Sequence, residues 1–265
     1  MSGRVTFVGA GPGAADLLTV RAARVLAEAD VVVWARSLVD PAVLEHCRAN
    51  AELVPSDDRT HDDVVAIFAR AAREGLHVAR VASGDPTVYG ALHEQLEACR
   101  ALGLAVEIVP GVSSMGAAAA ALGQELTVPD VSQSLILTRR PTRTSMPPNE
   151  DLQALAQHGT TMVLFLSVRR PRELQADLLE GGYAPDTPCA VVYRASWPDE
   201  LVVRCPLSEL AAEIRGAKIT TQALVILGPA LDLSAEAGRS HVYDAGYGHR
   251  YRPLGRPDRY RKAAE

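Results

Sequence analysis

Cysteine is scarce in this sequence. Only four of the 265 residues are cysteines, and no two of them form a Cys-x-x-Cys pair. Zinc sites and disulfide frameworks need closely and regularly spaced cysteines, whereas Cys47, Cys99, Cys189 and Cys205 are spread along the chain. We therefore expect four free thiols and no bound metal.

Excess positive charge and long apolar runs are missing too. The formal net charge is -5, so no overall positive field attracts nucleic acid. No apolar run approaches the roughly 18 residues of a membrane span, so we expect no membrane partner. The first residues lead directly into a strand-like run at 4–9, without the regions of a signal peptide. We expect a cytoplasmic protein.

The common hydrolytic motifs are also absent. There is no Gly-x-Ser-x-Gly elbow and no His-Glu-x-x-His pair, and the seven histidines are scattered. His61 and His93 fall in expected helices, where surface positions are the simplest interpretation. The sequence therefore identifies no catalytic nucleophile, acid or base, and the catalytic residues are unknown at this stage.

The first half of the chain alternates between two hydrophobic periods. Short apolar runs, typical of strands, alternate with segments that are apolar at helical spacing. This alternation predicts βαβ units and a mostly parallel, doubly wound α/β sheet. We expect strands at 4–9, 31–34, 76–82 and 104–109, and helices at 16–29, 41–48, 61–74 and 88–102, with one more ending at 122 behind Ser113 as N-cap.

A second α/β domain is expected after residue 122. The stretch 123–130 has no clear period and contains Pro129. We place the junction there, giving domains at 1–122 and 123–233, and a loosely packed polar tail at 234–265. The second half predicts an antiparallel hairpin of strands 190–194 and 201–205. Its other strands are expected at 134–138, 161–167 and 223–227, and its helices at 151–158, 171–180 and 207–215.

Three expected strands of the first half end in turns of small residues. Ligands of doubly wound sheets bind outside the carboxyl ends of the strands, so three such turns on one rim predict a binding edge. The turns are Gly9-Ala10-Gly11-Pro12-Gly13, Ser83-Gly84-Asp85-Pro86 and Pro110-Gly111-Val112-Ser113-Ser114.

The first turn also matches a dinucleotide-binding fingerprint. Gly9-x-Gly11-x-x-Ala14 follows a strand and precedes a helix. The second strand, however, ends without the carboxylate that would bind a ribose, and Pro12 delays the helix start that a pyrophosphate needs. Arg36 at the end of that strand leaves an NADP-dependent oxidoreductase open as an alternative.

The three turns together resemble the signature motifs of the tetrapyrrole methylase family. The similarity covers Val8–Gly13 with Asp16–Thr19, then Ser83–Gly90, then Pro110–Ser114, and extends to about Pro229. It implies a two-domain α/β fold with a mostly parallel N-terminal sheet, a mixed C-terminal sheet and the active site in the cleft between them. It also implies S-adenosyl-L-methionine as methyl donor, S-adenosyl-L-homocysteine as product, and a homodimer.

The resemblance assigns cofactor contacts to the residues that match the family motifs. Two of the assignments have structural alternatives, since Asp85 is also a common turn residue before proline and Leu166 also fits plain core packing. The implied contacts are Pro12, Ser83, Gly84, Asp85, Val88, Ser113, Ser114, Leu166 and Ala195.

One run narrows the resemblance to a branch of the family. Ser132–Arg139, followed by Arg143–Pro147, is similar to members that methylate carbon 11 of the corrin precursor precorrin-4 or its cobalt complex. Two departures are the missing glycine before Arg143 and the presence of Arg36 where related members tend to have glycine. A methylase acting at another carbon of a corrin or uroporphyrinogen stays open as an alternative.

A tetrapyrrole with a rim of carboxylates needs local cations in a protein of net charge -5. Arginine suits carboxylates because its guanidinium binds them in a bidentate fork. The alternative is a set of solvated surface charges that contribute little. The predicted substrate contacts are Arg139, Arg140 and Arg143, with a second cluster at Arg169, Arg170 and Arg172.

Overall fold

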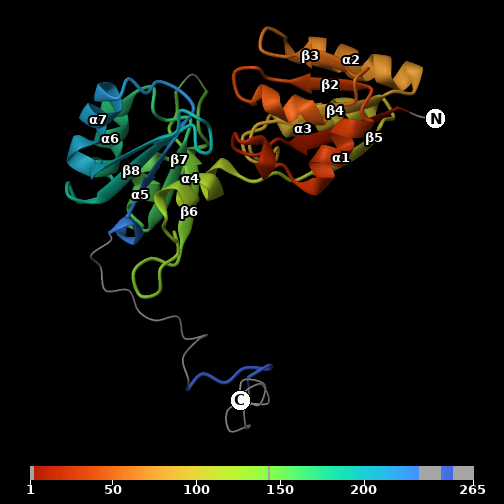
Figure 1. Ribbon diagram of the computed structural model, residues 1–265. Helices are drawn as coiled ribbons and strands as arrows, with labels where there is room; N and C mark the ends of the chain where they lie inside the picture. Colours follow the sequence, from red (N-terminus) through yellow and green to blue (C-terminus); the bar gives the residue numbers. More distant parts are fainter. Residues whose placement is uncertain (1–2, 143, 233–245, 253–265) are drawn as a thin grey trace.

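Two α/β domains, each built on a five-stranded sheet, lie side by side (Figure 1). The computed structural model describes residues 3–142, 144–232 and 246–252. Arg143 and most of the tail predicted at 234–265 lie outside these residues. The two-domain α/β fold expected from the resemblance is confirmed.

The N-terminal sheet is entirely parallel, in the order β3-β2-β4-β1-β5. Four of its strands were predicted from their apolar runs. The fifth, β3, was missed because its four residues are two apolar residues between a glutamate and a proline, too short an apolar run to indicate a strand. The strands are β1 (Arg4–Gly9), β2 (Val31–Trp34), β3 (Glu52–Pro55), β4 (His77–Ala82) and β5 (Ala105–Val109).

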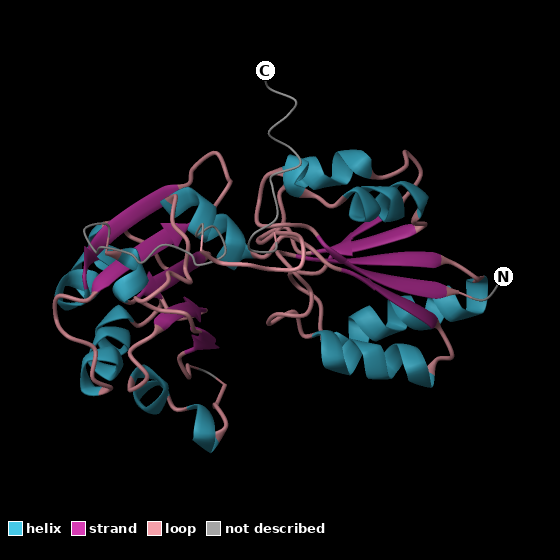
Figure 2. Cartoon of the chain, turned by 90° about the horizontal axis from the view of Figure 1, so that it is seen from below, coloured by secondary structure: helices cyan, strands magenta, loops and turns pink. Residues whose placement is uncertain are grey.

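Helices cover both faces of this sheet, as Figure 2 shows for the fan of strands near the N-terminus. On one face lies α1 (Val20–Glu28), and on the other lie α2 (His61–Glu74) and α3 (Leu92–Ala101). A capping box of Thr60 and Asp63 starts α2, which ends at Gly75 in the left-handed conformation. The predicted helix at 16–29 is instead a 3-10 turn, Ala15–Leu17, followed by α1, and the segment Pro41–His46 is a 3-10 helix.

The C-terminal sheet is mixed, in the order β6-β7-β10-β8-β9. Only β6 and β7 are parallel, and β8 and β9 form the predicted antiparallel hairpin. Burial on both faces explains why β10 is apolar throughout. The strands are β6 (Leu135–Arg139), β7 (Thr161–Phe165), β8 (Pro188–Tyr193), β9 (Leu201–Pro206) and β10 (Ala223–Leu227).

The alanine-rich helix α4 (Ser114–Leu122) packs against the second sheet, not the first. Its residues Ala117, Ala118 and Leu122 share a buried cluster with side chains of β7, β8 and β10. The opposite face of that sheet is covered by α5 (Leu152–Ala156), α6 (Pro171–Glu180) and α7 (Leu210–Gly216). By its contacts α4 packs with the C-terminal sheet although it precedes residue 122, and the boundary after Leu122 stays a prediction.

Several expected absences can be compared with the described part of the chain. Its four cysteines are free thiols. Within the same residues, no group of three or more histidine, cysteine, aspartate or glutamate side chains is arranged to hold a metal ion. None of the described helices combines the length and apolar character needed to cross a membrane.

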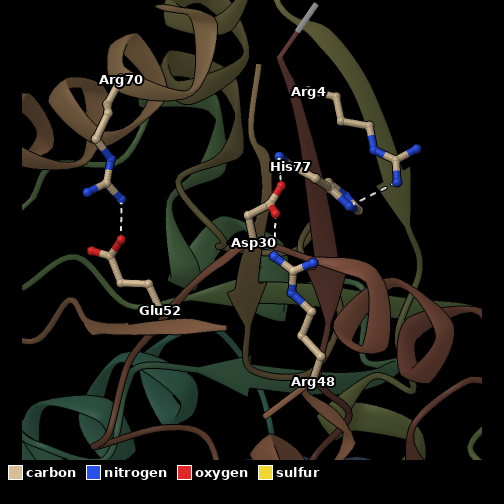
Figure 3. Close-up of polar contacts among 6 residues, drawn as sticks. All are labelled: Arg4, Asp30, Arg48, Glu52, Arg70 and His77. Carbon is tan, nitrogen blue, oxygen red and sulfur yellow. Dashed lines mark hydrogen bonds and ion pairs between the residues drawn. The ribbon is translucent and has the colours of Figure 1, made fainter. Parts of the chain in front are cut away.

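A polar cluster lies at the amino ends of the N-terminal strands, away from the turns described above (Figure 3). The buried His77 ring accepts a hydrogen bond from the Arg4 guanidinium at Nδ1 (3.0 Å), which leaves Nε2 to donate to Thr6 Oγ1 (2.9 Å). The backbone N–H of His77 donates to Asp30 (2.6 Å), which also accepts from Arg48. These contacts fix His77 as a neutral ring.

The surroundings of His77 link folding to pH. Burial and the Arg4 guanidinium lower the pKa of His77 below its ordinary 6.5, although Asp30, Glu28 and Glu107 act in the opposite direction. A group with a lowered folded-state pKa takes up its proton more readily when unfolded. Stability from His77 is therefore present above about pH 6.5 and is lost as the pH falls below it.

We predict that the free energy of unfolding decreases between pH 6.5 and 5, by up to about 1.4 kcal/mol per pH unit for one proton. His77→Gln should flatten this slope, because no ring remains to protonate. His93→Gln is the matched control, since the His93 side chain is 82% exposed and should leave the slope unchanged. Urea denaturation at both pH values measures it, and equal slopes in all three proteins would contradict the assignment.

Candidate active site

The three small-residue turns meet at one rim of the N-terminal sheet. They follow β1, β4 and β5, and β1 pairs with both of the others, so their carboxyl ends are neighbours. Gly11 and Gly84 exchange two backbone hydrogen bonds, of 3.2 and 2.7 Å. The prediction of a shared rim is confirmed.

Glycine is required at these turns because backbone packs against backbone. A Cβ at Gly9 would stand 2.4 Å from the Gly111 nitrogen. A Cβ at Gly111 would stand 2.0 Å from the Gly84 carbonyl oxygen and 2.8 Å from Gly9 Cα. Real Cβ atoms do not approach other atoms this closely, so these positions exclude side chains for reasons of space.

Asp85 ties the second turn to the third. Its carboxylate accepts hydrogen bonds from the Thr87 backbone N–H (2.8 Å), the Thr87 hydroxyl and the Gly111 backbone N–H (2.9 Å). Burial alone would raise the pKa of Asp85, but these hydrogen bonds outweigh it and hold the pKa below the ordinary value. Asp85 is therefore ionised at neutral pH and organises the turn that it belongs to.

A cavity of about 540 Å³ lies between this rim and the C-terminal domain. The structure places all nine predicted cofactor contacts on its wall, although they come from both domains and from positions 12 to 195 of the chain. Binding of a cofactor by these residues stays a prediction. The nine are Pro12, Ser83, Gly84, Asp85, Val88, Ser113, Ser114, Leu166 and Ala195.

The C-terminal wall of the cavity comes from the ends of β7 and β8 and the start of β10. It includes residues that the sequence interpretation did not assign, namely Phe165, Trp197 and the segment 220–224. The only sequence signal for the last segment is that it belongs to the part resembling the family. Gln222 has a left-handed backbone (φ 54°), which is rare for glutamine. The sequence therefore gives no local indication that the chain turns at Gln222.

Left-handed backbone is concentrated at this cavity. Among the described residues, eight that are not glycine have positive φ. Leu166 (φ 53°), Arg194 (φ 46°) and Gln222 line the cavity, and the Tyr89 ring (φ 54°) packs 5.3 Å from the ring of Phe165 on its wall. Such conformations persist only where the surroundings hold them, and they cluster at functional sites. Leu166 is 62% exposed, so plain core packing does not explain its position.

The predicted substrate arginines differ in their surroundings. The Arg139 guanidinium donates to the carbonyls of Thr144 (3.3 Å) and Ser145 (2.8 Å) and so holds its loop together. Arg140 is only 14% exposed and pairs with Asp177 at 2.5 Å, which commits its side chain to the interior of the domain. From the second cluster, Arg169 is exposed and lines the cavity.

Arg36, on which the dinucleotide alternative depends, is engaged elsewhere. Its backbone N–H and its Nε both donate to the Asp57 carboxylate, at 2.8 and 3.3 Å, and the Ser37 N–H donates to the same group at 2.9 Å. Arg36 is also not among the residues that line the cavity. The structure gives it the role of closing a turn beside Leu38.

The chain is similar to known proteins along most of its length. Residues 4–211 match the family model of the tetrapyrrole (corrin/porphyrin) methylases. The chain is 42% identical to a cobalt-precorrin-4 C(11)-methyltransferase of Methanocaldococcus jannaschii, covering 94% of this chain and 96% of that protein. It is 44% identical to a precorrin-4 C(11)-methyltransferase of Mycobacterium tuberculosis, covering 93% and 98%.

Solved structures extend the similarity to three dimensions. A cobalt precorrin-4 methyltransferase superimposes with a TM-score of 0.84 at 41% identity, covering 86% of this chain and 96% of that one. A uroporphyrin-III C-methyltransferase of Thermus thermophilus, complexed with S-adenosyl homocysteine, gives a TM-score of 0.74 at 33% identity, covering 86% and 99%.

We predict that Gly111→Ala lowers the free energy of unfolding by about 1–3 kcal/mol, as overpacking does, because its Cβ collides with the backbone of the other two turns. Gly116→Ala is the matched control. Gly116 lies in α4 with nothing within 4 Å of an added Cβ, so alanine there should stabilise by about 0.5–1 kcal/mol. Chemical denaturation of both variants measures this, and a tolerated alanine at Gly111 would show that the turns are not in contact.

Proposed function

The chain belongs to the tetrapyrrole methylase family, and from this premise we propose that it transfers a methyl group from S-adenosyl-L-methionine to carbon 11 of precorrin-4, or of its cobalt complex, in cobalamin biosynthesis. One observation carries the proposal. The nine residues that match the family's motifs, scattered over both domains, line a single cavity. Membership of a methylase family overturns the NADP-dependent alternative.

The cavity suits a nucleoside with a charged tail. Its volume of about 540 Å³ lies within the range of sites for small ligands, about 300–1,000 Å³. Val88, Leu166 and Val192 supply apolar wall, and the hydroxyls of Ser114 and Thr220 offer polar contacts. These residue types fit S-adenosyl-L-methionine without a metal ion or a covalent intermediate.

Methyl transfer depends more on how the protein orients the two reactants than on reactive side chains. When bound, S-adenosyl-L-methionine supplies a methyl group on a positively charged sulfur, and the positive charge disappears during transfer to carbon. An apolar wall that excludes water favours loss of charge. Rigid turns that fix the approach direction contribute as well, since oriented reactants reach effective molarities of about 10⁵–10⁸ M. The packed glycine turns and Asp85 provide such rigidity on the N-terminal side.

Arg169 is our proposed contact for a substrate carboxylate. It lines the cavity and is exposed, so its guanidinium is open to a ligand at the mouth. Arg139 supports the same mouth through its loop, and Thr142 of that loop also lines the cavity. Arg143, predicted from the sequence for the same role, lies outside the described residues. We do not propose Arg140 as a substrate contact, because its guanidinium forms an ion pair with Asp177.

We also propose a homodimer and a cytoplasmic location. The edge strand β5 exposes Val106 (37%) and Ile108 (38%), and Val20 (69%) begins the helix α1 beside it. The Arg21–Glu107 ion pair, at 3.9 Å, joins that helix to β5. An apolar strip along an unpaired strand edge favours burial against a second copy. Light scattering measures the assembly.

The direct test of the function is a product analysis. Purified protein is incubated with S-adenosyl-L-methionine carrying a labelled methyl group and with precorrin-4 or cobalt-precorrin-4. We expect one added methyl by mass and a label on carbon 11 by NMR. A label on another carbon would favour the alternative of a different corrin or uroporphyrinogen methylase, and no transfer to either substrate would overturn the proposal.

We predict that Asp85→Ala weakens S-adenosyl-L-homocysteine binding at least tenfold, about 1.4 kcal/mol, because three hydrogen bonds that shape the cofactor turn are lost. Asp63→Ala is the control, since it removes the Asp63 half of the capping box of α2 and should lower stability without changing affinity. Calorimetry and thermal unfolding on one preparation separate the effects. Lower stability with unchanged affinity in Asp85→Ala would assign it a turn role only.

We predict that Arg169→Ala raises the KM for the tetrapyrrole at least tenfold and leaves S-adenosyl-L-homocysteine affinity unchanged. Arg169→Lys should restore part of the loss, because lysine keeps the charge but not the bidentate fork. Arg172→Ala is the matched control and should change little, because Arg172 belongs to the same predicted cluster and is exposed but does not line the cavity. Steady-state kinetics at two salt concentrations measures this. Equal KM values in all variants would remove Arg169 from the substrate site.

A further inference from the structure

The turn that follows β8 reaches across to the first glycine turn. The indole Nε1 of Trp197 donates to the Pro12 carbonyl at 2.9 Å. The Ala14 backbone N–H donates to the Ser196 hydroxyl at 3.0 Å. Two hydrogen bonds therefore join residues about 185 positions apart and connect the two domains directly.

The Trp197 ring packs directly against Gly13. A Cβ on Gly13 would stand 2.2 Å from Cδ1 and 2.5 Å from Nε1 of that indole. The backbone of Gly13 is not in the left-handed region, unlike that of Gly11 (φ 76°). Glycine is required at position 13 by the tryptophan of the other domain, and not by the geometry of its own turn.

Trp197 is itself held in place by its own turn. The Arg194 guanidinium lies 3.9 Å from the centroid of the indole ring, a cation–π contact. Arg194 also pairs with Asp199 at 2.5 Å, and the Ser196 N–H donates to Glu200 at 2.6 Å. Arg194 and Ser196 (φ 67°) are left-handed, which such a network can maintain.

Both partners of this contact line the cavity. Pro12 stands on the N-terminal side, and Arg194, Ala195 and Trp197 stand on the C-terminal side. The Trp197–Pro12 hydrogen bond thus spans the cavity wall at the point where the domains meet. A second contact, from Gln222 to the Ser37 carbonyl, joins the domains at another part of the wall.

We propose that Trp197 is a positioning residue for the cofactor. It locks the turn 11–14 against the C-terminal wall and presets the width of the cavity before the ligand arrives. A preset site binds more tightly because less ordering is needed on binding. This role rests on the proposed function. Trp197 affects cofactor binding through its contacts with Pro12 and Gly13.

The sequence offers an unusually clean test, because it contains only two tryptophans, Trp34 and Trp197. Trp34 is buried, and its Nε1 has no hydrogen-bond partner within the described part of the chain. Trp34→Phe therefore deletes an indole N–H that bonds nothing, while Trp197→Phe deletes one that joins the domains. In Trp34→Phe, the remaining tryptophan emission, separated from that of the tyrosines by selective excitation, comes from Trp197 alone.

The experiment is a titration of each protein with S-adenosyl-L-homocysteine by calorimetry and fluorescence. We expect Trp34→Phe to bind like the wild type and to report binding by a change in Trp197 emission. Trp197→Phe should bind at least fivefold more weakly while its ligand-free melting temperature stays near that of Trp34→Phe. Gly13→Ala, which displaces the indole by collision, should weaken binding at least as much and keeps the test decisive if Trp197→Phe folds poorly.

The outcomes separate this role from the proposed function. Binding by the wild type together with unchanged affinity in Trp197→Phe and Gly13→Ala would overturn the positioning role and leave the methyltransferase proposal standing. Absence of binding in the wild type and Trp34→Phe would overturn the use of this cofactor, and the positioning role with it. Weaker binding in Trp197→Phe and Gly13→Ala, with unchanged binding in Trp34→Phe, supports the positioning role and the use of this cofactor.

Discussion

Backbone-to-backbone contact among three turns is the constraint on which the site depends. Gly9 and Gly111 approach each other and the Gly84 carbonyl oxygen so closely that neither has room for a Cβ, and Asp85 closes the arrangement through the Gly111 N–H. The parallel order of β4, β1 and β5 brings these turns together, and the helices on both faces keep the strands in that order. The turns that carry the first wall are thus positioned by main-chain contacts, which do not change with side-chain rotamers.

The second wall is built differently. Leu166, Arg194 and Gln222 have left-handed backbone conformations that the surrounding elements hold, and all three line the cavity. One domain therefore positions its wall by main-chain packing, and the other by backbone held in strained conformations. Such strain costs on the order of 1 kcal/mol or more per residue, and the packing of the C-terminal sheet offsets it. This division explains why the motifs rich in glycine all lie in the first half of the chain.

The same division explains how far the sequence allowed prediction. Apolar pattern was sufficient for four strands of the first sheet and for the β8–β9 hairpin, because these segments are short runs rich in apolar, β-branched residues. It failed for β3, whose two apolar residues lie between a glutamate and a proline, and it did not show that α4 packs on the second sheet, because an alanine-rich helix carries no signal of which sheet it will cover. Glycine motifs revealed the first wall. Positions such as Gln222 and the Arg140–Asp177 pair depend on tertiary contacts that have no local pattern.

The attachment of α4 to the second domain has a mechanical consequence. Gly111 is tied to the first domain through Asp85, whereas Ser114 opens a helix that packs on the second sheet. The segment from Gly111 to Ser114 connects the two domains, and only the residues within it can act as a pivot there. Ser113 and Ser114 also line the cavity. A rotation of one domain against the other would therefore turn about an axis next to the ligand. Atoms near the axis would shift little, and the Trp197–Pro12 and Gln222–Ser37 hydrogen bonds, which cross between the domains, would limit how far the domains turn. The residues that would hold the cofactor in our proposal therefore lie where a rotation of the domains moves them least.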